Sequence, residues 1–421
     1  MSKANRSRVW HPFTQHALQP DATMIATAER EWLTTPDGRR ILDGISSWWV
    51  VTHGHRHPKI VAAIKDQIDR LDQVIFAGFT HEPAERLAEA LVLLSPKGLD
   101  HVFFSDSGST AVEVAIKMAL GTFHNRGDKR HRILALEHGY HGDTVGAMSA
   151  GARGVFSTPY APLLFEVTRI PFPHSGREQG TIDAIAAACR AGDVAALIIE
   201  PLILGAGGML TYSAATLAEM ARTARAYGAL LIADEVMTGW GRTGTLFACT
   251  QAGLSPDLMC IAKGITGGSL PLAATLATAD IFDAHYSADR ARTFFHSSSY
   301  TANPVACAAA LANCEIWRTE PVLDRIANLA LAQRQHIAAF DGDADFANVR
   351  QTGTITALDI PASDAGYLAD VGPKLYAFFL ERNLLLRPLG NTIYVMPPYC
   401  IDDAGLGSIY ASIHDAADAC L

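Results

Sequence analysis

Short apolar runs alternate with amphipathic segments along most of the chain. Each run is bounded by Gly, Asp or another polar residue, which is typical of strands buried on both faces of a parallel sheet. The predicted strands are 101–104, 133–136, 195–199, 229–233, 258–262 and 272–276. Helical segments are predicted at 59–71, after residue 105, at 214–227 and at 305–317. This alternation predicts an α/β fold with a mostly parallel central sheet.

Composition restricts the possible partners. The chain has 421 residues, 49% hydrophobic and 18% charged, so we expect a compact globular protein with more than one core. A net charge of −9 and the lack of a basic run argue against nucleic acid and an anionic membrane surface as partners. The seven cysteines show no CxxC spacing, and the start MSKANRSRVWHPF has no apolar signal region. These features favour a cytoplasmic protein with reduced thiols.

Two of the predicted strands end in charged residues that suggest chemistry. Asp234 and Glu235 follow the run at 229–233, and Lys263 follows the run at 258–262. Ligands of α/β sheets bind outside the carboxyl ends of the strands, so the two strands would bring an anion and an amine to one edge. Pyridoxal phosphate needs a lysine that forms a Schiff base and a carboxylate that keeps the pyridine nitrogen protonated. A lysine alone would more often be a solvated strand end.

A helix start with small residues offers an anion site. Ser105 to Thr110 reads SDSGST and leads into an apolar helical stripe. Free backbone N–H groups at such a start can bind phosphate, but Ser and Thr also favour plain N-capping. The stretch by itself fits both interpretations. Together with Lys263, it favours phosphate binding by Gly108 and Ser109.

Further candidates lie in the aromatic and histidine-rich segments. His53, His55 and His57 alternate as strand-borne metal ligands would, but Gly54 and Pro58 break a strand, so we expect a turn and no metal. The glycines at 205–208 lack dinucleotide-binding spacing. The flat ring of Trp48 suits a substrate pocket. Arg387, between an apolar run and Pro388, suits a guanidinium that binds a carboxylate, with a rim salt bridge as the alternative.

The sequence resembles a known enzyme family. DEVMTGWGRTG at 234–244 and CIAKGITGG at 260–268 resemble the signature of class III (ω-) aminotransferases, which are pyridoxal phosphate enzymes of fold type I. Matching blocks run in the family's order from Trp10 to Pro398. The resemblance implies an N-terminal arm and hairpin at 1–50 that joins the small domain, a large cofactor-binding domain at 51–317, and the rest of a smaller α+β domain at 318–421.

The resemblance also implies roles for individual residues. Lys263 and Asp234 would be catalytic, binding the aldehyde carbon and the pyridine nitrogen of the cofactor. The other cofactor-binding positions would be Gly108, Ser109, Tyr140, Ser298 and Ser299. Ser299 stands where the family has a Thr that reaches the partner's cofactor phosphate, which implies a homodimer with active sites at the interface. Substrate would contact Phe13, Trp48, Tyr140, Lys263, Ser297 and Arg387.

Three functions remain open. The blocks WHPFT, DGISSWW, HGYHGDT and RPLGNTIYVMPPY resemble the family members that convert 8-amino-7-oxononanoate to 7,8-diaminononanoate in biotin biosynthesis, usually with S-adenosylmethionine as amino donor. A second possibility is an ω-aminotransferase for a diamine or β-amino acid with a 2-oxo acid. Many of those have Gln where this chain has Met237, which cannot donate a hydrogen bond to the cofactor's phenolic oxygen.

The third possibility is a non-catalytic pyridoxal phosphate binder, which the presence of both Lys263 and Asp234 disfavours. The amino donor stays open in this comparison. Phe13 stands where the enzymes that use S-adenosylmethionine usually have Tyr, and Ser297–Ser298–Ser299 replaces their Gly–Pro–Thr.

Overall fold

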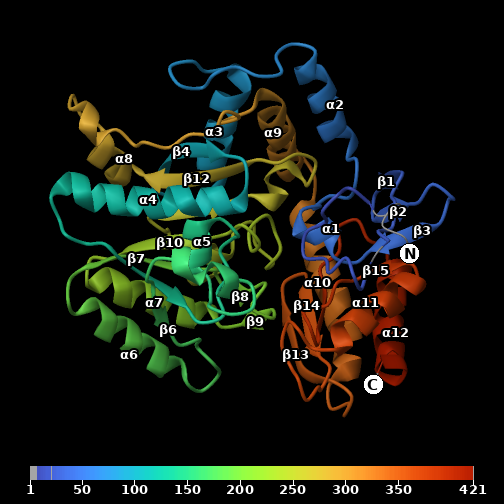
Figure 1. Cartoon of the computed structure of the whole chain (residues 1–421). Helices are drawn as coiled ribbons and strands as arrows, with labels where there is room; N and C mark the ends of the chain where they lie inside the picture. Colours follow the sequence, from blue (N-terminus) through green and yellow to red (C-terminus); the bar gives the residue numbers. More distant parts are fainter. Residues whose placement is uncertain (1–6, 20, 421) are drawn as a thin grey trace.

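The computed structural model describes residues 7–19 and 21–420 and has two lobes (Figure 1). Residues 1–6 of the predicted N-terminal arm lie outside the described residues. The large lobe is built on a seven-stranded sheet of order β4-β12-β11-β10-β7-β5-β6. Its strands are β4 (Leu99–Ser105), β5 (Arg132–Leu136), β6 (Thr168–Ile170), β7 (Val194–Ile199), β10 (Leu230–Asp234), β11 (Leu258–Ile261) and β12 (Ala273–Thr278). All six predicted strands are present, and β6 is an addition.

The direction of the strands confirms the mostly parallel sheet. β10 runs parallel to β7 and β11, and β5 runs parallel to β6 and β7. Only β12 is antiparallel to its neighbours, β11 and β4. Ala233 of β10 pairs with Met259 of β11, so these two strands end side by side. The chain thereby brings the residues after both strands to one edge of the sheet.

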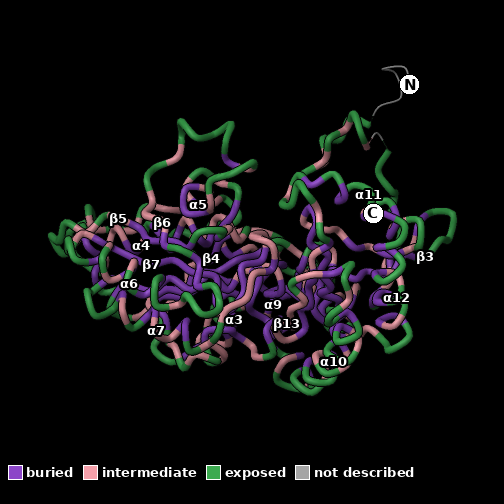
Figure 2. Tube along the Cα trace, turned by 90° about the horizontal axis from the view of Figure 1, so that it is seen from below, coloured by how far each residue is buried: buried purple, intermediate pink, exposed green. Residues whose placement is uncertain are grey.

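Helices cover both faces of this sheet. Leu258 and Cys260 of β11 pack with α4 on one face, whereas Met259 and Ile261 pack with α3 and α9 on the other. This alternation follows from the two-residue period of a strand. The helices of the large lobe are α2 (Pro58–Ile68), α3 (Glu82–Leu94), α4 (Gly108–Arg126), α5 (Val145–Ala150), α6 (Glu178–Cys189), α7 (Ala214–Ala226), α8 (Ala279–His285) and α9 (Pro304–Thr319). Figure 2 shows the buried residues gathered along the sheet.

The small lobe combines segments from both ends of the chain. Leu42 of the N-terminal hairpin pairs with Leu384, which is more than 300 residues later in the sequence. Its strands are β1 (Thr27–Glu29), β2 (Trp32–Thr34), β3 (Arg40–Asp43), β13 (Ala347–Thr352), β14 (Ile355–Asp359), β15 (Leu384–Leu385) and β16 (Thr392–Val395). Its helices are the short turn α1 (Ser46–Trp49) and α10 (Val322–Ile337), α11 (Val371–Glu381) and α12 (Asp403–Cys420). β2 and β3 form the hairpin predicted around Pro36–Gly38.

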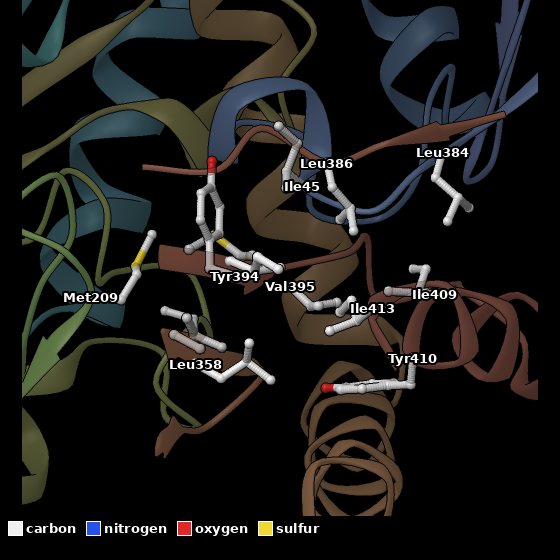
Figure 3. Close-up of a cluster of buried hydrophobic side chains, with 14 of the residues drawn as sticks. Ile45, Met209, Leu358, Leu384, Leu386, Tyr394, Val395, Ile409, Tyr410 and Ile413 are labelled. Atoms are coloured by element: carbon white, nitrogen blue, oxygen red, sulfur yellow. The ribbon is translucent and has the colours of Figure 1, made fainter. Parts of the chain in front are cut away.

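An apolar core holds the small lobe together. Tyr394 and Val395 of β16 pack with Ile409 and Ile413 of α12 in a cluster of buried side chains (Figure 3). The same cluster includes Ile45, just before α1. The domain division at residues 50/51 and 317/318 stays a prediction, and α9 continues two residues past the second boundary. No helix within residues 7–19 and 21–420 is long and apolar enough to cross a membrane.

Candidate active site

A cavity of about 420 Å³ opens where β10 and β11 end and α4 begins. The strands β8 (Ile203–Leu204) and β9 (Leu210–Thr211) form a short antiparallel hairpin around the glycine loop predicted at 205–208. Residues that the sequence predicted for the site, from four separate segments, line this cavity. The lining includes Trp49, Asp106, Gly108, Ser109, Tyr140, His141, Glu200, Asp234, Val236, Met237 and Lys263.

Lys263 and Asp234 lie on the same wall of this cavity, as the sequence predicted. Asp234 is the last residue of β10, and Lys263 follows β11 by two residues. Lys263 has a backbone φ of +46°, a conformation in which a side chain is strained. Its ammonium nitrogen lies 5.3 Å from the ring centroid of Trp49. Burial lowers the pKa of Lys263 below its ordinary value, which favours the neutral amine that nucleophilic chemistry needs.

His141 holds the Asp234 carboxylate in place. Its Nδ1 lies 2.7 Å from Asp234 Oδ2, and both side chains are buried. Asp234 Oδ1 accepts a hydrogen bond from the backbone N–H of Val236 at 3.1 Å. This contact of His141 was not predicted from the sequence. The only available signal was its place after β5, whose carboxyl end lies at the same edge of the sheet as that of β10.

The carboxylate of Glu235, the residue after Asp234, binds to the loop that follows β10. Glu235 accepts hydrogen bonds from the backbone N–H groups of Ala248 and Cys249 at 3.0 and 2.7 Å, and from the hydroxyl of Thr238. It does not line the cavity. Glu235 therefore organises the loop after β10, and of this pair only Asp234 lines the cavity.

The start of α4 fits an anion. Ser107 caps the helix, since its hydroxyl accepts the backbone N–H of Thr110 at 3.2 Å. The backbone N–H groups of Gly108 and Ser109 meet no acceptor in the described part of the chain. A Cβ on Gly108 would lie 2.5 Å from Val236, so only glycine allows this close approach. Ser107 is therefore the helix cap, and the two N–H groups that follow can bind an anion, while phosphate binding by Gly108 and Ser109 stays a prediction.

Tyr140 and Glu200 also line the first cavity. Glu200 accepts the backbone N–H groups of Tyr140 and Gly205, each at 2.9 Å. Burial raises the pKa of Glu200 to about 7. Burial, with the Asp143 carboxylate nearby, also raises the pKa of Tyr140, so its phenol stays protonated at neutral pH. Asp143 in turn donates its backbone N–H to the Ser109 hydroxyl at 3.0 Å.

A second cavity, of about 310 Å³, adjoins the first. Trp49, Tyr140 and Lys263 line both cavities, so the amine lies where the two meet. The second cavity is mainly aromatic and also includes Phe13, Trp48, Phe156, Tyr367, Arg387 and Tyr394. Its size and apolar lining suit the carbon chain of a small substrate.

Arg387 provides the cationic group of the second cavity. Its guanidinium lies 5.2 Å from the Trp48 ring centroid and donates to the carbonyl oxygen of Phe13 at 2.9 Å. The Phe13 ring meets the Trp48 ring edge to face, with centroids 5.5 Å apart. Among residues 7–19 and 21–420, no carboxylate lies within ion-pair distance of Arg387. The structure therefore does not support the rim salt bridge considered for Arg387.

Ser297, Ser298 and Ser299 line neither cavity of this chain. Ser297 and Ser299 are exposed, and Ser298 donates its hydroxyl to Asp106, which lines the first cavity, at 2.8 Å. Their contacts to substrate and cofactor stay predictions, since the Ser299 contact was expected from a neighbouring chain.

The three alternating histidines have three separate partners. His53 bonds to Asn313 at 2.8 Å, His55 to Asp43 at 2.8 Å, and His57 lies 3.7 Å from Glu320. His53 thus contacts α9, His55 contacts β3, and His57 contacts the residue that follows α9. No group of ligands arranged for a metal occurs among the described residues.

The sequence profile for class III aminotransferases matches residues 14–417. The chain belongs to this family. A class III aminotransferase binds pyridoxal 5'-phosphate, and the cavity fits that cofactor: two free N–H groups for its phosphate, a buried carboxylate for its ring nitrogen and a buried amine for its aldehyde. The protein is a pyridoxal phosphate-dependent transaminase of fold type I, as the resemblance implied.

Relatives and solved structures agree with the family assignment. The chain is 48% identical to the adenosylmethionine-8-amino-7-oxononanoate aminotransferase of Synechococcus elongatus, covering 97% of this chain and 98% of the relative. The enzyme of the same name from Methanocaldococcus jannaschii superposes with a TM-score of 0.94 at 32% identity, covering 98% and 97% of the two chains. A pyridoxal phosphate-bound amine transaminase from an uncultivated Pseudomonas species gives 0.91 at 31% identity, covering 99% of each.

Proposed function

We propose that this aminotransferase transfers an amino group to 8-amino-7-oxononanoate, forming 7,8-diaminononanoate for biotin biosynthesis, with S-adenosylmethionine as the donor. The arrangement of Arg387 in the second cavity carries this proposal. Its guanidinium lies against Trp48 and has no carboxylate partner in the described part of the chain. A carboxylate at the far end of an aliphatic substrate would supply that partner, while the reacting ketone reaches Lys263. The names of the similar enzymes support the same acceptor.

Two residues would carry the chemistry. Pyridoxal phosphate, when bound, supplies a ring that withdraws electrons from the reacting carbon. Asp234, which His141 holds, would keep a proton on the cofactor's ring nitrogen through a charge-assisted hydrogen bond. Lys263 Nζ would hold the cofactor's aldehyde carbon, and its amine, once free, would accept and return the proton that moves between the two reacting carbons. The lowered pKa of Lys263 suits it to accept that proton.

Other residues would orient the two reactants. Gly108 and Ser109 would bind the cofactor's phosphate through their backbone N–H groups, and Tyr140, which lines the same cavity, would contact its ring. Trp48 and Phe13 form the apolar wall along the acceptor's methylene chain. Met237 is buried in the cofactor cavity and donates no hydrogen bond there, a difference from the Gln that many diamine aminotransferases carry. This difference favours the proposed acceptor over a 2-oxo acid.

The active form would be a cytoplasmic homodimer. Ser297 and Ser299 lie outside the cavities of their own chain and are exposed, as contacts to a neighbouring active site require. Phe295 and Tyr300, in the same segment, are 69% and 64% exposed, which suits apolar contacts with a second copy. The seven cysteines are all free, in keeping with a reducing compartment. Sedimentation that shows a stable, fully active monomer would contradict the dimer.

Acceptor preference tests the proposed function. With one common donor, kcat/KM should be at least about 100-fold higher for 8-amino-7-oxononanoate than for pyruvate or 2-oxoglutarate, because its carboxylate lies several methylenes from the reacting ketone, whereas the 2-oxo acids carry theirs next to the ketone or only two methylenes away. The Lys263→Ala variant serves as the blank for uncatalysed transfer. Equal or higher kcat/KM with either 2-oxo acid would contradict the proposal and support the alternative ω-aminotransferase.

A further inference from the structure

The helical turn that carries Trp48 and Trp49 is left-handed, which is unusual for residues other than glycine. Ser46, Ser47, Trp48 and Trp49 have φ angles of +54°, +45°, +70° and +74°, so α1 is a left-handed helical turn. Its closing hydrogen bonds run from Trp49 N to Ile45 O and from Val50 N to Ser46 O, both at 2.9 Å. Each side-chain-bearing residue in this conformation is strained. Four in a row persist only where surrounding contacts hold them.

This turn presents both indoles to the reacting centre. The Trp49 ring lies beneath Lys263 Nζ and donates its Nε1–H to the Tyr394 hydroxyl at 2.9 Å. The Trp48 ring lies on the other side, between Arg387 and Phe13. A right-handed turn over the same residues would direct the two side chains elsewhere, because the hand of the backbone fixes the direction of each Cβ. The rings of Trp48 and Trp49 can therefore take these positions only if the turn is left-handed.

Asp43 holds the entrance of the turn. Its Oδ1 accepts the backbone N–H groups of Ser47 at 2.9 Å and Ile45 at 3.3 Å. Its Oδ2 accepts the Ser47 hydroxyl and His55 Nε2, each at 2.8 Å. The residue is completely buried, so all of its hydrogen-bonding capacity is directed to the turn and to His55. A buried carboxylate with four such donors is a rigid support.

Arg242 holds the exit of the turn. Its Nη2 donates to the carbonyl oxygens of Trp49 at 3.3 Å and Val51 at 2.9 Å, and its Nη1 donates to that of Pro397 at 3.2 Å. The side chain is 1% exposed and has no carboxylate within ion-pair distance among the residues the structure describes. The guanidinium also lies 5.1 Å from the Tyr399 ring centroid, but a buried cation without a carboxylate partner is costly in free energy. The hydrogen bonds of Arg242 explain its burial, because they fix the backbone beside the two indoles and join it to the adjoining small lobe.

We propose that Asp43 and Arg242 are positioning residues for the acceptor pocket. They hold the left-handed turn, the turn fixes Trp48, and Trp48 fixes the guanidinium of Arg387 that meets the acceptor's carboxylate. Neither residue lines the acceptor cavity, so their effect on the substrate passes through the turn. The inference rests on the proposed function only for the identity of the acceptor.

A double-mutant cycle between Asp43 and Trp48 tests this proposal. Asp43→Asn should raise KM for 8-amino-7-oxononanoate about tenfold while kcat falls less than about threefold, because the pocket is disturbed and the chemistry at Lys263 is not. In a Trp48→Ala background, the same Asp43→Asn change should alter KM less than about twofold, since the indole it positions is gone. An unchanged KM in Asp43→Asn, or an equal rise in both backgrounds, would overturn the proposal.

Two variants of Ser47 test the backbone geometry of the turn without changing a charge. They also provide a test if the Asp43→Asn variant does not fold. Ser47→Gly and Ser47→Ala both lose the hydroxyl, but only glycine adopts φ +45° without strain. We expect KM to rise about threefold more in Ser47→Ala than in Ser47→Gly. Equal KM values in the two variants would contradict a role through the turn. Gln333→Leu, which disrupts a buried hydrogen-bond network in the small lobe, is the control for general destabilisation and should leave KM unchanged.

These experiments distinguish an error in the positioning role of Asp43 from an error in the proposed acceptor. If the wild-type enzyme does not use 8-amino-7-oxononanoate, the proposed function is wrong, and the cycle is run with whichever carboxylate-bearing acceptor the enzyme does use. Dissociation constants of that acceptor, measured in a Lys263→Ala background without turnover, should follow the same pattern as KM. Dissociation constants unaffected by Asp43→Asn would overturn the positioning role.

Discussion

The Nδ1 atom of His141 lies 2.7 Å from Oδ2 of Asp234, and the surrounding protein buries both side chains. One carboxylate oxygen is therefore committed to the imidazole. The other accepts the Val236 N–H and faces the cavity. The pair fixes the orientation of the carboxylate before any ligand enters, which is the preorganisation that electrostatic stabilisation requires.

Replacing Asp234 with Asn should remove the charge that keeps the ring nitrogen protonated while preserving the shape of the side chain. A lost charge-assisted hydrogen bond costs about 1.5–3 kcal/mol, so kcat should fall roughly 10- to 100-fold or more. Steady-state kinetics at saturating cofactor measures this. A kcat near that of wild type would mean that Asp234 does not act on the ring.

Replacing His141 with Ala should lower kcat less than Asp234→Asn does, because the carboxylate remains but loses one hydrogen bond. We expect a cost of about 0.5–1.5 kcal/mol, the typical net value of one hydrogen bond. Because both residues act through one contact, the Asp234→Asn/His141→Ala double variant should be little worse than Asp234→Asn alone. Strictly additive losses would show that His141 serves the fold independently.

Replacing Lys263 with Ala should abolish turnover, since no other amine lines the cavity among the described residues. The proposed phosphate site at the start of α4 is unchanged by this substitution, so the variant should still bind part of the cofactor. Activity assays and the pyridoxal phosphate content after gel filtration measure both effects. Residual activity within about tenfold of wild type would contradict the assignment.

Much of the large lobe is predictable because its strands carry strong local patterns. The run before Asp234 and the run before Lys263 are short, apolar and bounded by polar residues, and both fold as adjacent buried strands. The direction of β12 was not predictable, because an apolar run has the same pattern in either direction. β6 was missed, since its three residues carry too short a pattern to recognise.

The supports of the site could not be predicted, because they depend on contacts between distant segments. His141 and Asp234 are 93 residues apart, and Arg242 reaches carbonyl groups more than 150 residues away in either direction. The left-handed turn violates the local preference of all four of its residues. Only the assembled surroundings favour it, so the sequence SSWW predicts that the Trp48 ring suits a substrate pocket but not how the turn places that ring.

Replacing Arg387 with Ala should cost on the order of 2–4 kcal/mol in kcat/KM for 8-amino-7-oxononanoate, because a charged hydrogen-bonding pair is lost. A carboxylate-free amino ketone of equal length should lose far less. Arg387→Lys keeps the charge but not the bidentate geometry, so it should fall between the two. Equal losses for both acceptors would mean that Arg387 supports the fold and that the carboxylate binds elsewhere.

Acid should destabilise the protein through His53. Burial, the largest influence, lowers the pKa of His53 to about 3, whereas in the unfolded chain it is 6.5. The folded state then binds fewer protons than the unfolded state, so stability present above pH 6.5 is lost as pH falls towards 3. The loss from His53 alone should reach roughly 2 kcal/mol at pH 5.

Thermal unfolding at pH 7 and pH 5 measures the His53 effect. His57, whose pKa is also lowered by burial, faces the same region together with Glu320 and Arg325, so the wild type carries both contributions. His53→Gln keeps a hydrogen-bonding group beside Asn313 and cannot titrate. The fall in Tm between the two pH values should be smaller in this variant. An equal fall would show that His53 does not control acid stability.

Transfer of a labelled amino group to the proposed acceptor tests the central claim most directly. Purified enzyme with pyridoxal phosphate, 8-amino-7-oxononanoate and S-adenosylmethionine labelled with ¹⁵N at its amino group should give 7,8-diaminononanoate carrying the label at carbon 7, detected by mass spectrometry. Lysine and other labelled amines, tested in parallel, separate an error in the donor from an error in the acceptor. Labelled 7,8-diaminononanoate from any donor supports the account. Its absence with every donor, while labelled alanine forms readily from pyruvate, would contradict it.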